Sequence, residues 1–361
     1  MLPSSFKMLD FFQALDGFAF WGIVLPLMVL GLVLLAFGGD WLADGAASLA
    51  VNLRVEPLVI GITVVSVATS APELFTCLIA GFREQGDSLI LGNIAGSNLA
   101  NIALILGVSA VIHPIAGRPR YFLWEIPWLI LASIIFIWSC RGGISQVQGV
   151  ILLVLMIGYL VVTIRLRSFF LKVLGPVYRL LGIIKNPQDL TIGNFDEMEE
   201  IEKKSLQKSL TLVIVGTVIL LVGASLLVDT AQVISIKLNV DQGFIGLTVV
   251  ALGTSLPELA ASVAAARKGQ TALIAGNIFG SNLFNMLFVG GVTASVTSIG
   301  WDGSLKIEMF LMIAVTCLLA FAFQKAGDGK RKMVRGMGLF FIVLYFGILV
   351  FSAMSLEPSV K

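Results

Sequence analysis

Two glutamates, Glu73 and Glu258, lie deep inside apolar stretches of the sequence. At the centre of a membrane helix a carboxylate costs roughly 2.5–3.5 kcal/mol, and no lysine or arginine lies at comparable depth here to neutralise it. Each glutamate ends a similar hexapeptide, ATSAPE in one place and GTSLPE in the other. A pair of protonated glutamates with a purely structural role would also explain the burial. The duplicated context favours instead two ionisable ligands for a cation.

The prolines before these glutamates, Pro72 and Pro257, each remove a backbone donor and disrupt a helix. Carbonyl groups one turn earlier, in 66–69 and 251–254, are therefore expected to lose their partners. Free backbone groups are tolerated at membrane depth only where they line protein or a cavity. Carboxylate, carbonyl, hydroxyl and amide oxygens would then converge, which is the ligand set of hard cations such as Ca²⁺ or Na⁺ rather than of soft transition metals.

A second motif occurs twice, as GNIAGSNLAN ending at Asn101 and as GNIFGSNLFN ending at Asn285. Each terminal asparagine can present an amide oxygen without added charge. Ser97 and Ser281 lie one turn earlier on roughly the same helix face. The four-residue glycine spacing also suits close packing between helices in lipid. The remaining asparagines are expected to hydrogen-bond the backbone or neighbouring helices: Asn93, Asn98, Asn277 and Asn282.

The chain as a whole has the composition of a multi-pass membrane protein. Of its 361 residues, 57% are hydrophobic and only 13% are charged, against about 25% charged residues in soluble domains. The net charge of +2 gives no reason to expect a nucleic-acid partner, and three scattered cysteines without a CxxC pair predict neither disulfides nor zinc. The sequence has no HExxH, P-loop or Ser–His pair. We therefore expect a transporter with the lipid bilayer as its partner, not an enzyme, and no cofactor.

About ten segments are long and apolar enough to cross a membrane, which takes about 20 residues each. We place them near 20–41, 57–81, 88–112, 122–140, 147–165, 209–230, 243–266, 271–298, 305–324 and 335–355. One polar linker divides them. The domains are therefore a first half at 22–165, a linker at 166–208 and a second half at 209–355.

The two halves repeat each other. With a shift of 185 positions, GITVVSVATSAPEL from Gly61 falls on GLTVVALGTSLPEL from Gly246, and the asparagine motif follows after a one-residue slip. Because each half holds an odd number of spans, the halves must be inverted relative to each other. The predicted fold is an all-α membrane protein of about ten transmembrane helices in two inverted five-helix repeats. Such repeats with interrupted helices are the signature of secondary transporters, whose sites lie near the membrane midplane.

The placement of lysine and arginine predicts the orientation. If the linker is cytoplasmic, 18 of the 24 basic residues lie in loops on its side of the membrane. Both termini would then lie outside the cytoplasm, and we expect a cell-membrane location. Three aspartates, Asp40, Asp44 and Asp229, lie near the ends of segments one and six. An interfacial carboxylate costs little there, and we expect a structural role for them.

At the TS-x-PE and GN-x-x-GSN blocks the chain resembles the cation/Ca²⁺ exchanger superfamily, which includes the sodium/calcium exchangers. The blocks look like the α-repeats of that family, and the resemblance covers residues 22–355. It implies a fold of ten transmembrane helices. It also implies that segments two, three, seven and eight bind the ions, while segments one and six slide past them to alternate access.

The resemblance implies a role for each motif position. Glu73 and Glu258 would be the central ligands shared by Ca²⁺ and Na⁺. Hydroxyl or carbonyl oxygens would come from Thr69, Thr254, Ser70 and Ser255. The inner and outer Na⁺ positions would use the carbonyls of Ser66 and Ala251 together with Ser97 and Ser281, and the middle of the site would be flanked by Asn101 and Asn285.

This sequence departs from some relatives at two of these positions. Several prokaryotic members and the K⁺-dependent branch have an aspartate where Asn285 stands, so K⁺ dependence is not expected here. Ser66 replaces a commoner alanine, although only its carbonyl is needed. The sequence also lacks the long cytoplasmic Ca²⁺-sensing domains of animal exchangers, and we expect no such regulation.

We therefore expect a secondary antiporter that exchanges Na⁺ for Ca²⁺ and works as a monomer. An H⁺-coupled Ca²⁺ exchanger on the same scaffold stays open, because buried carboxylates also carry protons. Another divalent cation could be the cargo. A passive cation channel fits less well, since channels usually form their pore by oligomerisation around a filter. A membrane scaffold without transport would tolerate conservative Glu→Gln changes.

Overall fold

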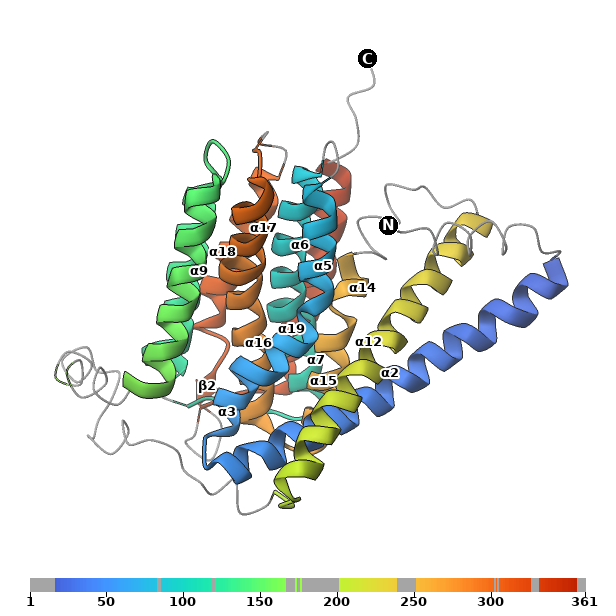
Figure 1. Cartoon of the computed structure of the whole chain (residues 1–361), viewed down its shortest axis with the longest axis horizontal. Coiled ribbons are helices and arrows are strands. Elements are labelled where there is room, and N and C mark those ends of the chain that lie inside the picture. The colour runs from blue at the N-terminus through green and yellow to red at the C-terminus, as the bar shows by residue number, and fades with distance from the viewer. Residues whose placement is uncertain are drawn as a thin grey trace.

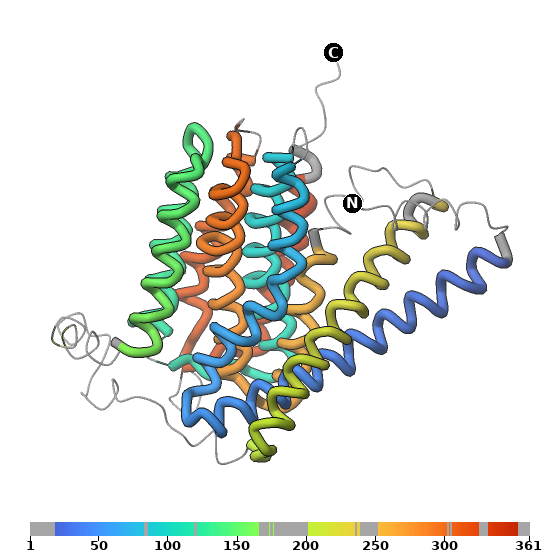
Figure 2. The backbone as a smooth tube through the Cα atoms, viewed as in Figure 1, coloured from blue at the N-terminus to red at the C-terminus, as the bar shows by residue number. Residues whose placement is uncertain are grey.

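The computed structural model is a helical bundle in which two long helices run obliquely (Figure 1). It describes residues 17–82, 86–118, 121–166, 173, 176, 201–238, 251–301, 303, 305–325 and 331–355. Most helices stand side by side, whereas α2 (Gly17–Leu53) and α12 (Leu206–Lys237) run together across the bundle. The smooth trace shows that this pair diverges from the other helices toward the N-terminal end of α2 (Figure 2).

Both halves combine long continuous helices with shorter helical pieces. In the first half, α2 is followed by α3 (Pro57–Ile60), the π-helix η1 (Gly61–Val65), α4 (Ser66–Thr69), α5 (Ala71–Gly81), α6 (Asp87–Leu99), η2 (Ala100–Ile105), α7 (Leu106–Ile112), η3 (Tyr121–Glu125), α8 (Ile126–Cys140), α9 (Gln146–Val161) and η4 (Val162–Leu166). In the second half, α12 is followed by α14 (Ala251–Thr254), α15 (Leu256–Arg267), α16 (Thr271–Leu283), η7 (Phe284–Val289), α17 (Gly290–Thr297), α18 (Lys306–Leu319) and α19 (Arg335–Ser355).

Seven of the described helices are long and apolar enough to cross a membrane, and the bent pair at 57–69 and 71–81 is an eighth candidate. These helices fall on predicted segments. Of the remaining two segments, 243–266 is described only from residue 251, and α18 is 14 residues long. Of the predicted linker at 166–208, the structure describes only residues 166, 173, 176 and 201–208, and α12 already begins at Leu206.

The predicted bounds of segments one and six were too short. Segment one is predicted to end at residue 41, but α2 continues to Leu53. Segment six is predicted to end at residue 230, but α12 continues to Lys237. Their oblique course explains the extra turns, because a tilted helix needs more residues to cover the same thickness.

Short strands join the connecting loops at one end of the bundle. β1 (Ile115–Ala116), β3 (Arg331–Met333) and β2 (Gln324–Lys325) form an antiparallel sheet in that order, and we call this the sheet end. Beyond the other end of α8, Ile144 pairs with Ile299, and we call this the bridge end. The sheet is a small addition to the predicted all-helical fold, confined to the loops.

Glycines allow α2 and α12 to cross at very short range. A Cβ atom added at Gly38 would lie 2.5 Å from the backbone nitrogen of Leu220, and one added at Gly223 would lie 2.7 Å from that of Leu35. Helices in lipid gain little from the hydrophobic effect between them and associate through such close van der Waals packing. The two helices therefore behave as one packed pair.

Ion pairs connect this pair to the bundle at the sheet end. Lys268, directly after α15, lies 2.7 Å from Asp44 and 3.7 Å from Asp40 on α2. Lys204, just before α12, lies 3.2 Å from the other carboxylate oxygen of Asp44. Asp40 and Asp44 thus have the structural role expected from the sequence.

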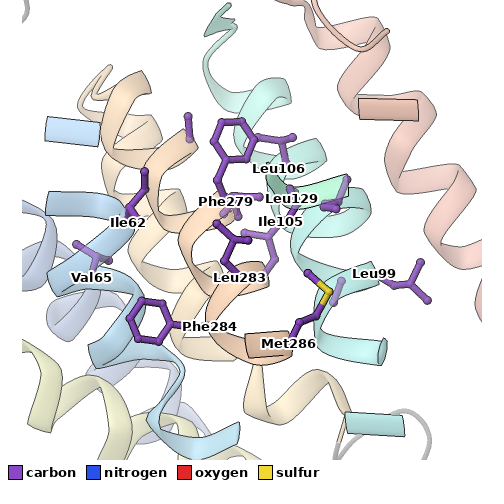
Figure 3. Close-up of a cluster of buried hydrophobic side chains, with 14 of the residues drawn as sticks. Ile62, Val65, Leu99, Ile105, Leu106, Leu129, Phe279, Leu283, Phe284 and Met286 are labelled. Atoms are coloured by element: carbon purple, nitrogen blue, oxygen red, sulfur yellow. The ribbon is translucent and has the colours of Figure 1, made fainter. Parts of the chain in front are cut away.

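The apolar core surrounds α16 and η7 (Figure 3). Every residue of α16 is buried. Phe279 and Leu283 on this helix belong to one buried cluster with Leu106 on α7 and Leu129 on α8. A helix enclosed on all sides can hold polar groups away from both lipid and water, so this is where a midplane site can be positioned.

Gly276 on α16 gives a test of this packing. A Cβ atom at this position would clash with the carbonyl oxygen of Leu58 and would lie 2.9 Å from the Cα atom of Gly61. We expect Gly276→Ala to lower the free energy of unfolding by about 1–3 kcal/mol, the usual cost of overpacking. Thermal unfolding of the purified protein in detergent measures this loss. Gly158→Ala is the matched control, because Gly158 is helical and exposed, and a Cβ atom added there would meet no atom within 4 Å. Equal destabilisation by both changes would contradict the close contact.

Candidate cation site

Both predicted glutamates lie in the first turn of a short helix that follows a break. α4 ends at Thr69 and α5 places Glu73 in its first turn, with a 45° bend between the two helices. α14 and α15 repeat this arrangement around Glu258. The exposed fractions of the two glutamates are 1% and 0%. A helix N-terminus carries partial positive charge, which favours a carboxylate at this position.

The break itself has the same backbone shape in each half. Ser70 adopts φ −83° and ψ 9°, and Ser255 adopts φ −88° and ψ 3°. The prolines that follow lie at the start of α5 and α15, as the sequence predicted. The two halves therefore repeat each other in backbone conformation as well as in amino-acid sequence.

Hydroxyl groups hold one oxygen of each carboxylate. Ser97 on α6 donates to Glu73 Oε1 at 3.4 Å, and Ser70 in the first half donates to Glu258 Oε1 in the second half at 3.1 Å. Oε2 of each glutamate is buried without a hydrogen-bond partner. Neither glutamate forms an ion pair within the described part of the chain. Each carboxylate is thus oriented by one oxygen and keeps the other available.

Two asparagines join the halves across the site in matching ways. Thr69 donates to Asn277 Oδ1 at 3.3 Å, and its repeat equivalent Thr254 donates to Asn93 Oδ1 at 3.2 Å. The sequence predicts that these asparagines bond the backbone or neighbouring helices, but the pairing between the two halves was not predicted. Their amide groups donate within their own half, Asn277 to Ser262 Oγ at 3.0 Å and Asn93 to Cys77 Sγ at 3.3 Å.

The asparagines that end the second motif lie in π-helices. Asn101 is in η2 and Asn285 is in η7, both with exposed fractions of 0%. α15 packs on η2, and α5 packs on η7, so each π-helix borders the glutamate-bearing helix of the other half. Asn285 donates to Asn98 Oδ1 at 3.2 Å, whereas its own Oδ1 and both polar atoms of Asn101 have no hydrogen-bond partner. π-helical turns occur often at functional sites.

One predicted loss of a backbone hydrogen bond was wrong, that of the Ser66 carbonyl. It accepts a hydrogen bond from the Ser70 N–H at 2.9 Å, because the proline lies two residues too late to free it. The missing N–H of Pro72 instead deprives the carbonyl of Ala68, four residues earlier. The Ser66 hydroxyl donates to the carbonyls of Gly61 and Asn277.

The remaining predicted positions differ in how directly they meet the glutamates. Ser281 donates to Asn277 Oδ1 at 3.4 Å and so belongs to the same network. Ser255 is buried with no partner for its hydroxyl. Ala251 begins α14, one turn before the break. The hydrogen bonds thus join Glu73 to Ser97, Glu258 to Ser70, and the threonines to the two asparagines. Thr254 also lies beside Glu73, and Thr69 lies beside Glu258.

The arrangement suits a hard cation. Glu258 is near enough to Glu73 for their charges to interact, and burying two like charges without compensation costs several kcal/mol per ion. Within the described residues no cluster of three or more His, Cys, Asp or Glu side chains could hold a metal. The available ligands are two carboxylates and neutral oxygens, which is the chemistry of Ca²⁺ and Na⁺ rather than of zinc or iron.

The fold and this buried oxygen site define a multi-pass membrane transporter. The family model described as sodium/calcium exchanger protein matches residues 23–165 and 208–354. The chain belongs to this family, whose members are transporters and not enzymes.

Individual relatives agree with the family assignment. An uncharacterized membrane protein of Methanocaldococcus jannaschii is 33% identical over 88% of this chain and 94% of its own length. The sodium/calcium exchanger MaX1 of Methanosarcina acetivorans is 27% identical over 84% of this chain and 92% of its own. A solved structure of the sodium-calcium exchanger NCX_Mj soaked with Na⁺ and Sr²⁺ superposes with a TM-score of 0.72 at 30% identity, covering 91% of this chain and 98% of that one.

Cation-dependent stabilisation tests the site directly. Ca²⁺ at 100 times its dissociation constant should stabilise the protein by about 2.7 kcal/mol, seen as a rise in the unfolding temperature. Glu258→Gln removes a charged ligand and should abolish this rise. Glu308→Gln is the matched control, because Glu308 bonds Ser352 on α19 outside the site. A full Ca²⁺ response in the Glu258 variant would exclude that carboxylate as a ligand.

Proposed function

We propose that this protein is an antiporter that exchanges Na⁺ for Ca²⁺ by alternating access around a site centred on Glu73 and Glu258. The observation that carries the proposal is the pair of buried glutamates from opposite halves, each oriented by a hydroxyl and each with an unpartnered oxygen. One Ca²⁺ neutralises two carboxylates, and Na⁺ ions can do the same. The two cargoes then compete for one set of ligands, which is the physical basis of antiport.

The proposed architecture is ten transmembrane helices in two inverted repeats, with a first half at 22–165, a cytoplasmic linker at 166–208 and a second half at 209–355. The ends of equivalent loops support the inversion. The loop after α7 leads to β1 at the sheet end, whereas the equivalent loop after α17 holds Ile299 at the bridge end. Likewise Gly81, the last residue of α5, approaches Thr297 at the bridge end, and Gly269 after α15 approaches His113 at the sheet end.

The proposed ligands follow from the site and the family. Glu73 and Glu258 bind both cargoes. The neutral oxygens that complete the coordination come from Thr69, Thr254, Ser70, Ser255, Asn101, Asn285, Ser97, Ser281, Ser66 and Ala251. The buried unpartnered oxygens of Glu73, Glu258, Asn285 and Ser255 support this choice. Asparagine at both 101 and 285 keeps the charge of the site at two carboxylates.

The sheet end is proposed to face the cytoplasm. Arg54, Arg118, Lys204, Lys268, Arg331, Lys332 and Arg335 belong to loops or helix starts at this end. The excess of lysine and arginine on cytoplasmic loops then places both termini outside. Such a protein belongs in the cell membrane, and the internal repeat supplies both halves of the site without a second subunit.

Counter-ion dependence is the decisive test. In proteoliposomes loaded with Na⁺ and placed in Na⁺-free medium, we expect ⁴⁵Ca²⁺ uptake at least tenfold above that of K⁺-loaded vesicles. The reason is that outward movement of Na⁺ supplies the energy for Ca²⁺ entry. Glu258→Gln should reduce the uptake to the background, while Glu308→Gln should not.

The same vesicles separate the rival mechanisms. Uptake driven by a pH jump without Na⁺ would assign the coupling to protons. The unpartnered Oε2 atoms of Glu73 and Glu258 could bind those protons. Uptake without any counter-ion gradient would indicate a channel. Competition by Sr²⁺, Mg²⁺ or Mn²⁺ for ⁴⁵Ca²⁺ uptake would show how far the cargo extends to other divalent cations.

A further inference from the structure

A groove outside the cation site lies between α8 and α18 at the bridge end. Its volume is about 770 Å³, within the range of roughly 300–1,000 Å³ that is common for ligand pockets. One wall comes from α8 and the loop after it, and the other from α18 and the loop before it. The groove therefore runs between two neighbouring helices from the loops toward the middle of the bundle.

Two positive charges lie in this groove. Arg141 follows the last turn of α8, and Lys306 begins α18. Neither has an ion-pair partner within the described part of the chain. The acidic residue in the first turn of α18, Glu308, accepts a hydrogen bond from Ser352 on α19 at 2.5 Å. Arg141 and Lys306 are the charged residues that line the described part of the groove, and their like charges favour a ligand with negative charge.

The walls of the groove are apolar and face the surroundings of the bundle. Trp138 is 66% exposed and Phe310 is 68% exposed, and Trp301 lies in the loop before α18. α8 is one of the helices that can cross a membrane, so its exposed apolar face meets acyl chains. Tryptophan is enriched at the membrane–water boundary, and long basic side chains near helix ends reach toward the head groups.

We propose that this groove binds one phospholipid with an anionic head group. The phosphate lies between Arg141 and Lys306, and an acyl chain covers the apolar wall that includes Ile134, Ile137 and Ile313. A soluble anion would satisfy the charges and leave this wall without a partner. A zwitterionic lipid brings its own cation, which opposes Arg141 and Lys306. The proposal rests on the groove alone and does not depend on whether Na⁺ or H⁺ drives transport.

Native mass spectrometry tests the proposal on the whole protein. The protein is released from nanodiscs that contain equal amounts of phosphatidylglycerol and phosphatidylcholine. We expect one tightly held phosphatidylglycerol per chain, and the double change Arg141→Gln with Lys306→Gln should lower that bound fraction about tenfold, since each basic residue contributes to attraction of anionic lipid. Ile313→Trp narrows the groove without changing charge and should also weaken binding.

Lys237→Gln is the matched control. Lys237 ends α12 and lies over the Phe20 ring, 5.0 Å from its centroid. Because α12 lies away from α18 (Figure 1), loss of this charge should leave lipid binding at the groove unchanged. Retained Ca²⁺-dependent thermal stabilisation shows that each variant is folded. Equal retention of both lipids by the unchanged protein would overturn the proposal. So would normal binding in the double variant, or full displacement of the lipid by inorganic phosphate.

Discussion

Two carboxylates held together in a water-poor interior are the constraint on which the rest of this structure depends. Each would lose several kcal/mol on leaving water without compensation. The chain places Glu73 and Glu258 in the first turns of α5 and α15, where helix dipoles favour negative charge. It also gives each a hydroxyl donor. The breaks before these helices are the means of creating two such N-termini at membrane depth.

The same constraint explains why the halves interlock instead of only touching. A site shared by two repeats needs both glutamates at a fixed separation, since a small change in distance alters a Coulomb interaction strongly at low dielectric. The hydrogen bonds from Thr69 to Asn277 and from Thr254 to Asn93 cross from one half to the other at equivalent positions. Gly276 and Gly61 let the backbones approach closely enough for these short side chains to meet.

The sequence was sufficient for features that depend on local chemistry. Proline cannot donate in a helix, so the breaks at Ser70 and Ser255 were predictable, and buried charge is rare enough to mark the glutamates. Features that depend on packing were not predictable. The length of α2 follows from its tilt against α12, and the partner of Asn277 lies 208 positions away in the chain. Pro72 frees the carbonyl of Ala68 and not that of Ser66, because a helical hydrogen bond joins residues four positions apart.

The two halves are not fully equivalent, because equivalent serines form different hydrogen bonds. Ser70 donates to Glu258, but its equivalent Ser255 has no partner; Ser97 donates to Glu73, but its equivalent Ser281 donates to Asn277. Two similar sequences therefore adopt two different hydrogen-bonding arrangements in one conformation. If the two halves exchanged these arrangements, Ser255 would bond Glu73 and Ser281 would bond Glu258, and in the proposed inverted architecture the site would face the opposite side. The proposed alternating access would then need only a switch of hydrogen bonds between equivalent side chains, which has a low structural cost.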